Sequence, residues 1–158
     1  MQIRIRTTGA VMYEAEFRAY TKANGGPSWD RTTTEVLEAL GADVVFEGAQ
    51  ATGGTVYQYS QASGVEQVDG KWYTKYILGP VFTGDTAAAD EAEYKARKDV
   101  EQAASVRASR NQLLKDCDWT QIADSTADKA AWAIYRTALR NLPAATGFPW
   151  TMTWPETP

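Results

Sequence analysis

The sequence predicts an α+β fold: a small N-terminal antiparallel sheet with two short helices, then a long helix and a C-terminal helical hairpin with an extended tail. Stretches rich in β-branched and aromatic residues alternate with glycine-rich breaks up to residue 84. Residues 85–115 contain neither glycine nor proline, and four of the six prolines follow residue 116. We therefore divide the chain into an α+β domain at 1–84, a connecting helix at 85–115 and a C-terminal module at 116–158.

The first domain begins with a strand and two short helices. Its opening sequence, QIRIR, alternates polar and apolar residues, which predicts a strand with Ile3 and Ile5 facing inward. Residues 13–23 carry aromatic side chains at helical spacing and run into the break NGGPS. A second short helix is expected within RTTTEVLEALGAD, with a threonine as its N-cap and Gly41 as its stop.

Two further strands are expected at Val56–Gln61 and Lys71–Leu78. Asp69-Gly70 lies between them and is a pair favoured in two-residue hairpin turns. The sequence GVEQV before this turn is a candidate extension of the hairpin. These stretches predict an antiparallel sheet.

The long helix at 85–115 is predicted from its alanines and from charge pairs four residues apart, such as Glu91 with Lys95. About thirty residues at 1.5 Å each give roughly 45 Å. Its apolar side chains form no sustained heptad seam, so we expect a solvated, linking helix and not a coiled coil. Such a length predicts a helix that projects from the sheet domain or packs against partner helices.

A final helix is expected before Pro143. It places Trp132, Tyr135 and Leu139 on one face, with Ser125 or Thr126 as the N-cap. Aromatic residues on a single face are typical of a helix that packs against the rest of the protein. The segment after Pro143 is too rich in proline for a helix, which predicts an extended path.

Composition excludes several functions. The net charge is −4 and the basic residues of the long helix lie among acids, which disfavours nucleic-acid binding. No apolar run reaches the length of a membrane span, and the N-terminus does not resemble a signal peptide. One cysteine, Cys117, agrees with a reducing compartment. These features predict a cytoplasmic protein that binds neither nucleic acid nor membrane.

No catalytic group is expected. The chain has no histidine, which removes the commonest general base and metal ligand. The acid pairs Asp116/Asp118 and Asp124/Asp128 lack the glycine and closing glutamate of a calcium loop and are better interpreted as caps and loops. Cys117 has no histidine to activate it. We therefore predict no enzyme activity, metal or cofactor.

Two aromatic groups remain as candidate contact surfaces. One belongs to the strands: Tyr57, Tyr59, Trp72, Tyr73 and Tyr76. They suit a sugar- or peptide-binding face, although an ordinary sheet face uses the same residues and is the favoured interpretation. The other is the tail, where the rings of Phe148, Trp150 and Trp154 must lie on this protein's own helices or on a partner.

The end of the chain resembles the C-terminal domain of phage tail assembly chaperones. The resemblance covers RNQLLKDCDWTQIAD, KAAWAIYRTALRNLP and FPWTMTWPETP, about Arg110 to Pro158. Its characteristic positions occur in the family's order and spacing: Arg110, Leu113, Leu114, Asp118–Gln121, Asp124, Trp132, Tyr135–Arg136, Leu139–Arg140, Pro143, Pro149 and Trp154–Pro155. Ala123 and Asn141 depart from the usual residues.

The resemblance implies a protein without enzyme activity that binds and masks a tail-fibre or other phage tail polypeptide. It acts in the host cytoplasm during assembly, and retention in the virion tail is an open alternative. A homo-oligomer and a hetero-complex with a trimeric fibre are both compatible with it. The candidate partner-binding residues are Trp119, Trp132, Tyr135, Arg136, Arg140, Phe148, Trp150, Trp154 and Pro155. The alternatives are a structural tail, baseplate or fibre component and, from another class, a glycan-binding module that uses Trp72 and Tyr76.

Overall fold

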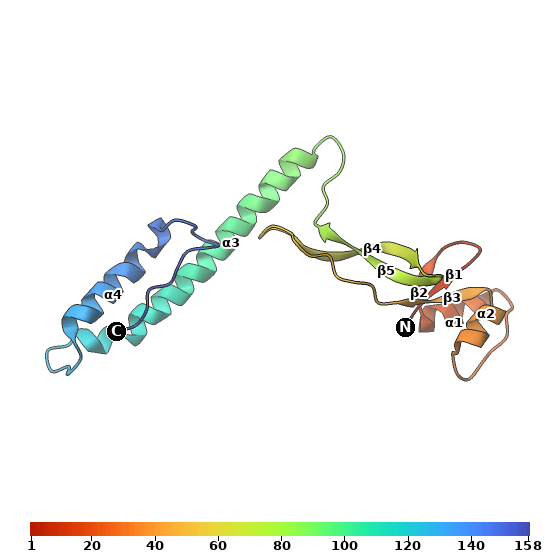
Figure 1. Ribbon diagram of the computed structural model, residues 1–158, viewed down its shortest axis with the longest axis horizontal. Helices are drawn as coiled ribbons and strands as arrows, with labels where there is room; N and C mark the ends of the chain where they lie inside the picture. The colour runs from red at the N-terminus through yellow and green to blue at the C-terminus, as the bar shows by residue number, and fades with distance from the viewer. The chain divides into compact units, whose positions relative to one another are not determined.

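The computed structural model describes residues 1–158 (Figure 1). The chain forms two compact units, Met1–Val81 and Phe82–Pro158. The first contains a five-stranded sheet and two short helices, and the second is helical. The mixed α+β class predicted from the sequence is confirmed.

The sheet of the N-terminal unit has the strand order β2-β1-β3-β5-β4. Its strands are β1 (Gln2–Ile5), β2 (Val11–Tyr13), β3 (Ala42–Phe46), β4 (Tyr59–Val68) and β5 (Lys71–Gly79). Most neighbours are antiparallel, but β3 and β5 are parallel, so the prediction of an antiparallel sheet is wrong at this position. The reason lies in the crossover after β3: the chain first forms the outer strand β4, and β5 then returns beside β3 in the same direction.

The β4–β5 hairpin confirms most of the predicted pairing. β4 begins three residues later than expected and runs through GVEQV to the turn. Asp69 and Gly70 both have positive φ, 47° and 77°, which is the conformation that a tight two-residue hairpin requires. The three-residue strand β2 was not predicted, because a stretch this short has no measurable periodicity.

Two helices cover one face of this sheet. They are α1 (Glu14–Ala23) and α2 (Thr34–Ala39), both near their predicted positions. The core beneath them consists of Ile3, Ile5, Phe17, Leu37 and Ala42. Thr33 is the N-cap of α2, and its side chain accepts a hydrogen bond from the Val36 N–H at 3.4 Å. The sequence therefore correctly predicts the inward residues of β1 and the threonine cap.

The segment after β3 passes against β5 without room for a side chain at Gly48. A Cβ atom there would overlap the backbone carbonyl oxygen of Thr74. We expect Gly48→Ala to destabilise the N-terminal unit by about 2 kcal/mol, because backbone must move to relieve the overlap. Chemical denaturation measures this loss. Gly54→Ala is the matched control, since its Cβ would meet only the side chains of Leu78 and Gln58; an equal loss in both variants would contradict the explanation.

The C-terminal unit is a helical hairpin with a tail. It contains α3 (Ala87–Asp116), a 3-10 turn η1 (Asp118–Gln121), α4 (Lys129–Asn141) and a second 3-10 turn η2 (Leu142–Ala144). In Figure 1, α4 runs back along the C-terminal half of α3. Both long helices lie within a few residues of their predicted positions. α3 buries only Ala103 and Val106, which agrees with the expected solvated helix.

The N-cap of α4 differs from the prediction. Asp128, not Ser125 or Thr126, caps the helix, and its carboxylate accepts hydrogen bonds from the N–H groups of Ala130 and Ala131 at 3.0 and 3.1 Å. The helix begins later than the sequence suggests, so Asp128, the residue directly before its first turn, is the N-cap.

The first half of the tail is also less extended than predicted. After η2 the chain makes a turn in which Trp150 and Thr151 donate their N–H groups to the Gly147 carbonyl oxygen at 2.8 and 2.7 Å. Gly147 has a φ of +83°, a value that glycine adopts at little cost. Only from Met152 onward does the tail lack regular structure and turns.

Candidate partner-binding surface of the C-terminal unit

The hairpin is held by a small core between α3 and α4. Cys117, Tyr135 and Leu139 are buried there, and Leu139 has no exposed surface. Partly buried side chains pack around them: Leu113, Leu114, Trp132 and Trp154. Burial raises the pKa of the Tyr135 hydroxyl above its usual value. Tyr135, one of the candidate partner-binding residues, therefore packs inside the hairpin.

Arg136 fastens α4 to the end of α3. Its Nη1 donates to the Leu114 carbonyl oxygen at 2.8 Å and to the Cys117 Sγ at 3.0 Å, while its Nη2 donates to the Asp118 Oδ1 at 2.7 Å. The hydrogen bond with Asp118 raises the pKa of the guanidinium above its usual value. Its contacts are internal, so Arg136 positions the turn between the two helices. Arg140, one turn later, is exposed.

The first two tail rings also lie on this protein's own helix. The Trp150 Nε1 donates to the Asp99 Oδ1 at 2.6 Å, and the Arg107 guanidinium lies 5.2 Å from the centre of the Phe148 ring. The Gln102 Nε2 contacts the Pro149 carbonyl oxygen at 3.5 Å. Both rings are half-buried on α3. The sequence allowed the tail rings to lie on this protein's own helices or on a partner, and here they lie on the protein's own helix.

Trp154 and Pro155 continue this arrangement nearer the end of the chain. The Trp154 ring packs against the core cluster of Cys117, Tyr135 and Leu139. Both residues are half-buried. They too contact the protein itself, so the tail aromatic residues are not a freely exposed surface.

The most exposed large apolar side chains of the family-like region lie elsewhere. Trp119 is 54% exposed and Ile122 is 53% exposed; we call these two residues the η1 patch. The Trp119 ring packs on Trp132 at a centroid distance of 6.2 Å. Next to it, Thr120 is fully buried, and its hydroxyl donates to the Cys117 carbonyl oxygen at 2.7 Å. The patch is thus presented by a turn that the core holds in place.

A second apolar surface lies on the side of α4 that faces away from the core. Ile134 is 73% exposed there. It lines an open depression of about 470 Å³ together with Ala133, Thr137, Ala138 and Asn141, which we call the outer face of α4. No charged side chain lines this depression. The sequence interpretation missed Ile134, although an isoleucine opposite the packing face of an amphipathic helix is a signal that could have identified it.

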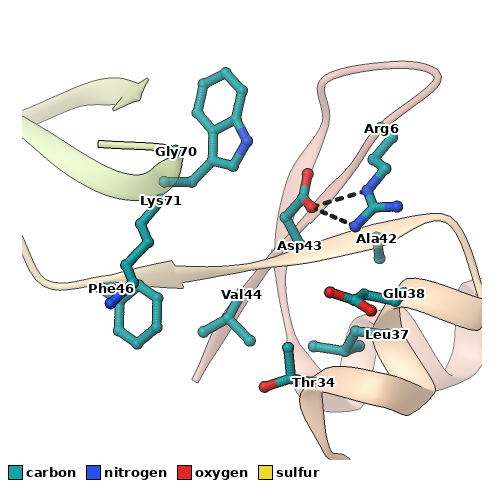
Figure 2. Close-up of a pocket in the computed structure, with 11 residues that line it drawn as sticks. Arg6, Thr34, Leu37, Glu38, Ala42, Asp43, Val44, Phe46, Gly70 and Lys71 are labelled. Atoms are coloured by element: carbon teal, nitrogen blue, oxygen red, sulfur yellow. Dashed lines mark hydrogen bonds and ion pairs between the residues drawn. The ribbon is translucent and has the colours of Figure 1, made fainter. Parts of the chain in front are cut away.

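The N-terminal unit contains a separate pocket of about 280 Å³ at the start of β5. Figure 2 shows the Arg6–Asp43 ion pair on one side and Lys71 with Phe46 on the other. Arg6 Nε donates to Asp43 Oδ1 at 2.8 Å, so the most strongly charged part of the pocket is internally neutralised. This pocket offers mixed polar and aromatic contacts.

The two aromatic residues that the glycan-binding alternative depends on have partners within the sheet. The Arg4 guanidinium lies 3.9 Å from the centre of the Trp72 ring. The Tyr76 hydroxyl hydrogen-bonds the Glu47 carboxylate, which raises the pKa of Tyr76. One face of Trp72 and the polar end of Tyr76 are therefore already occupied.

Two further structural findings concern membranes and metals. No helix combines the length and the apolar composition needed to cross a bilayer. No group of three or more acidic or cysteine side chains is arranged as metal ligands would be.

Residues 103–158 match the family model of the phage tail assembly chaperone protein. This match confirms the resemblance seen in the sequence and supports a role in phage tail assembly. No curated protein and no solved structure gives a significant match.

The segment that matches this family, residues 103–158, contains all the residues of the hairpin core, and we call it the chaperone segment. It begins in the middle of α3 and includes η1, α4, η2 and the tail. The η1 patch and the outer face of α4 both lie inside it. Val100, an exposed apolar residue of α3, lies just outside it and provides a control position.

Proposed function

We propose that this protein is a phage tail assembly chaperone that binds an apolar segment of a tail-fibre polypeptide and masks it from solvent until the fibre assembles. One observation carries the proposal: within the chaperone segment, Trp119, Ile122 and Ile134 are more than half exposed on a helical hairpin whose core is otherwise closed. Large apolar side chains that a folded core leaves in water are typical of binding surfaces.

Both patches have the chemistry of a protein contact. Trp119 offers a large ring with few rotatable bonds, and tryptophan is a residue type that often dominates binding energy. The outer face of α4 is apolar and uncharged, so an apolar client segment meets no desolvated charge there. A client that spans both patches would bury surface on η1 and on α4.

A tail-fibre polypeptide suits such a surface better than a folded partner. Fibre subunits that intertwine expose apolar surface and unpaired strand edges before assembly, and these are sites of aggregation. Covering them requires binding and no chemistry. The protein accordingly acts without enzyme activity, in the host cytoplasm, before the particle is complete.

Release after assembly distinguishes this function from a structural one. A chaperone leaves its client, whereas a tail, baseplate or fibre component remains at fixed stoichiometry. Mass-spectrometric quantification of purified particles separates the two roles. We expect the protein in assembly intermediates and not in finished particles; a fixed copy number in the particle would establish the structural alternative.

Co-expression with the tail-fibre polypeptide of the same phage tests the proposal. We expect the amount of soluble, trimeric fibre to rise severalfold when the protein is present. The double variant Trp119→Ala, Ile134→Ser should lose most of this gain, because it truncates the most exposed large apolar side chain of each patch and leaves the buried core residues unchanged. Val100→Ala, which truncates an exposed side chain outside the chaperone segment, is the matched control. Fibre that is equally soluble without the protein, or with the double variant, would contradict the proposal.

A further inference from the structure

We propose that the groove between α3 and α4 that holds Trp154 is a binding site for an extended peptide with a tryptophan anchor, and that Met152–Pro158 is its releasable, built-in occupant. The inference rests on the proposed function in one respect: the segment that competes with the chain's own end belongs to the tail polypeptide. The groove and its present occupant are features of this chain alone.

The groove has the composition of a site for an aromatic anchor. Trp154 packs on the buried cluster of Cys117, Tyr135 and Leu139, which joins the end of α3 to α4, and Leu113, Leu114 and Trp132 pack against the same cluster. Beside the ring, an open depression of about 650 Å³ continues along α3 and is lined by Ala108, Ser109, Gln112 and Leu113. The anchor site is therefore continuous with unfilled apolar surface, which a longer peptide could cover.

The chain's end is held in this groove by very few contacts. Up to Thr151 the tail is fixed by the turn at Gly147 and by the bond from Trp150 to Asp99. From Met152 to Pro158 the chain makes no hydrogen bond and no ion pair. Four of these seven residues are exposed, and only Met152, Trp154 and Pro155 are half-buried.

This distribution of contacts favours release. Ordering a backbone segment costs conformational entropy, and here no hydrogen bond offsets that cost. The partial burial of one tryptophan ring and its two neighbours provides the attraction. Segments of this kind open at much lower free energy than the core on which they lie. The turn at Gly147 would remain as the fixed base from which residues 152–158 detach.

The occupant also shows what the groove recognises. Pro155 follows the anchor and restricts Trp154 to an extended conformation. Aromatic-lined grooves bind such proline-containing segments because little entropy is lost on binding. A tail-polypeptide segment of the same kind, an exposed tryptophan next to a proline, would have to displace the chain's own end. Its apparent affinity is reduced by the fraction of molecules in which the groove is closed.

A peptide added in trans tests this directly. The probe is the fluorescein-labelled synthetic peptide TMTWPETP, and the readout is fluorescence anisotropy with the full chain. We expect Trp154→Ala, in which the anchor site is vacated, to bind the probe at least tenfold more tightly than the unmodified chain. The probe with alanine in place of its tryptophan should not bind. Trp72→Ala, which removes a tryptophan of the N-terminal unit, should behave like the unmodified chain.

Equal binding to the unmodified chain and to Trp154→Ala, or binding to neither, would overturn the inference. If Trp154→Ala loses helix content by circular dichroism, relaxation dispersion of backbone amides in the unmodified chain decides instead. Millisecond exchange should then appear in the amides of residues 152–154, 156 and 157 and not in those of residues 147, 148, 150 and 151, and its absence would refute a releasable segment. Neither experiment contains a tail protein. Failure of these experiments would therefore not contradict the binding role proposed for the η1 patch and the outer face of α4. Failure of the co-expression test would likewise not contradict the peptide-binding result.

Discussion

Leu139→Ala is expected to destabilise the C-terminal unit by about 3 kcal/mol, because truncating a fully buried leucine removes its packing and leaves a cavity. Leu139 has no exposed surface and lies at the centre of the α3–α4 core. Urea unfolding followed by tryptophan fluorescence measures the change, since four of the six tryptophans belong to this unit.

The matched control is Ile134→Ala, five residues earlier on the same helix. Its side chain is 73% exposed, so its truncation should change the free energy of unfolding by less than about 0.5 kcal/mol. The two variants therefore separate stability from binding: one should unfold the hairpin and the other should weaken only client contact. Similar destabilisation by both would show that α4 does not pack as the structure describes.

Arg136→Ala is expected to cost about 2 kcal/mol in the same unit. The loss comes mainly from the Leu114 carbonyl oxygen and the Cys117 Sγ, which both lose the guanidinium as a donor. The Leu114 carbonyl oxygen then keeps only the weaker hydrogen bond from the Cys117 thiol at 3.3 Å among its side-chain donors. The ion pair with Asp118 contributes less, because that carboxylate is 64% exposed and its charge is screened by water. Urea unfolding monitored by circular dichroism at a helix wavelength provides the measurement.

Two further variants check this explanation. Arg136→Lys should recover only part of the loss, because a single ammonium group lacks the planar geometry with which the guanidinium reaches three acceptors. Arg140→Ala, on the exposed side of the same helix, should have almost no effect. A full recovery with lysine would mean that charge alone matters at this position.

The local elements of the fold were largely predictable from the sequence, whereas the sheet topology was not. The spacing of apolar residues around Phe17 and Leu139 and the glycine-free run before Cys117 place the helices to within a few residues. Hairpin chemistry at Asp69-Gly70 predicts the antiparallel β4–β5 pair. The parallel contact between β3 and β5 depends on the path of the segment after Gly48, and that path has no periodic pattern in the sequence.

The placement of the tail aromatic residues could not be predicted from the sequence, and the reason is physical. Aromatic residues in a proline-rich tail need a surface, but their sequence does not say whose surface it is. Here α3 supplies it, with Asp99 and Arg107 facing the rings of Trp150 and Phe148. Ile134 was overlooked because hydrophobic periodicity identifies the packed face of a helix and draws attention away from the opposite one.

Site-specific photo-crosslinking tests the central claim most directly. A benzoyl-phenylalanine placed at position 134 on the outer face of α4 reports contact with the tail-fibre polypeptide during co-expression. The same group at Val100 serves as the control, because this residue is 70% exposed and lies outside the chaperone segment. We expect a crosslink to the fibre from position 134 and none from position 100. Crosslinks from position 100 alone, or from neither position while the complex still forms, would show that the client binds elsewhere on the protein.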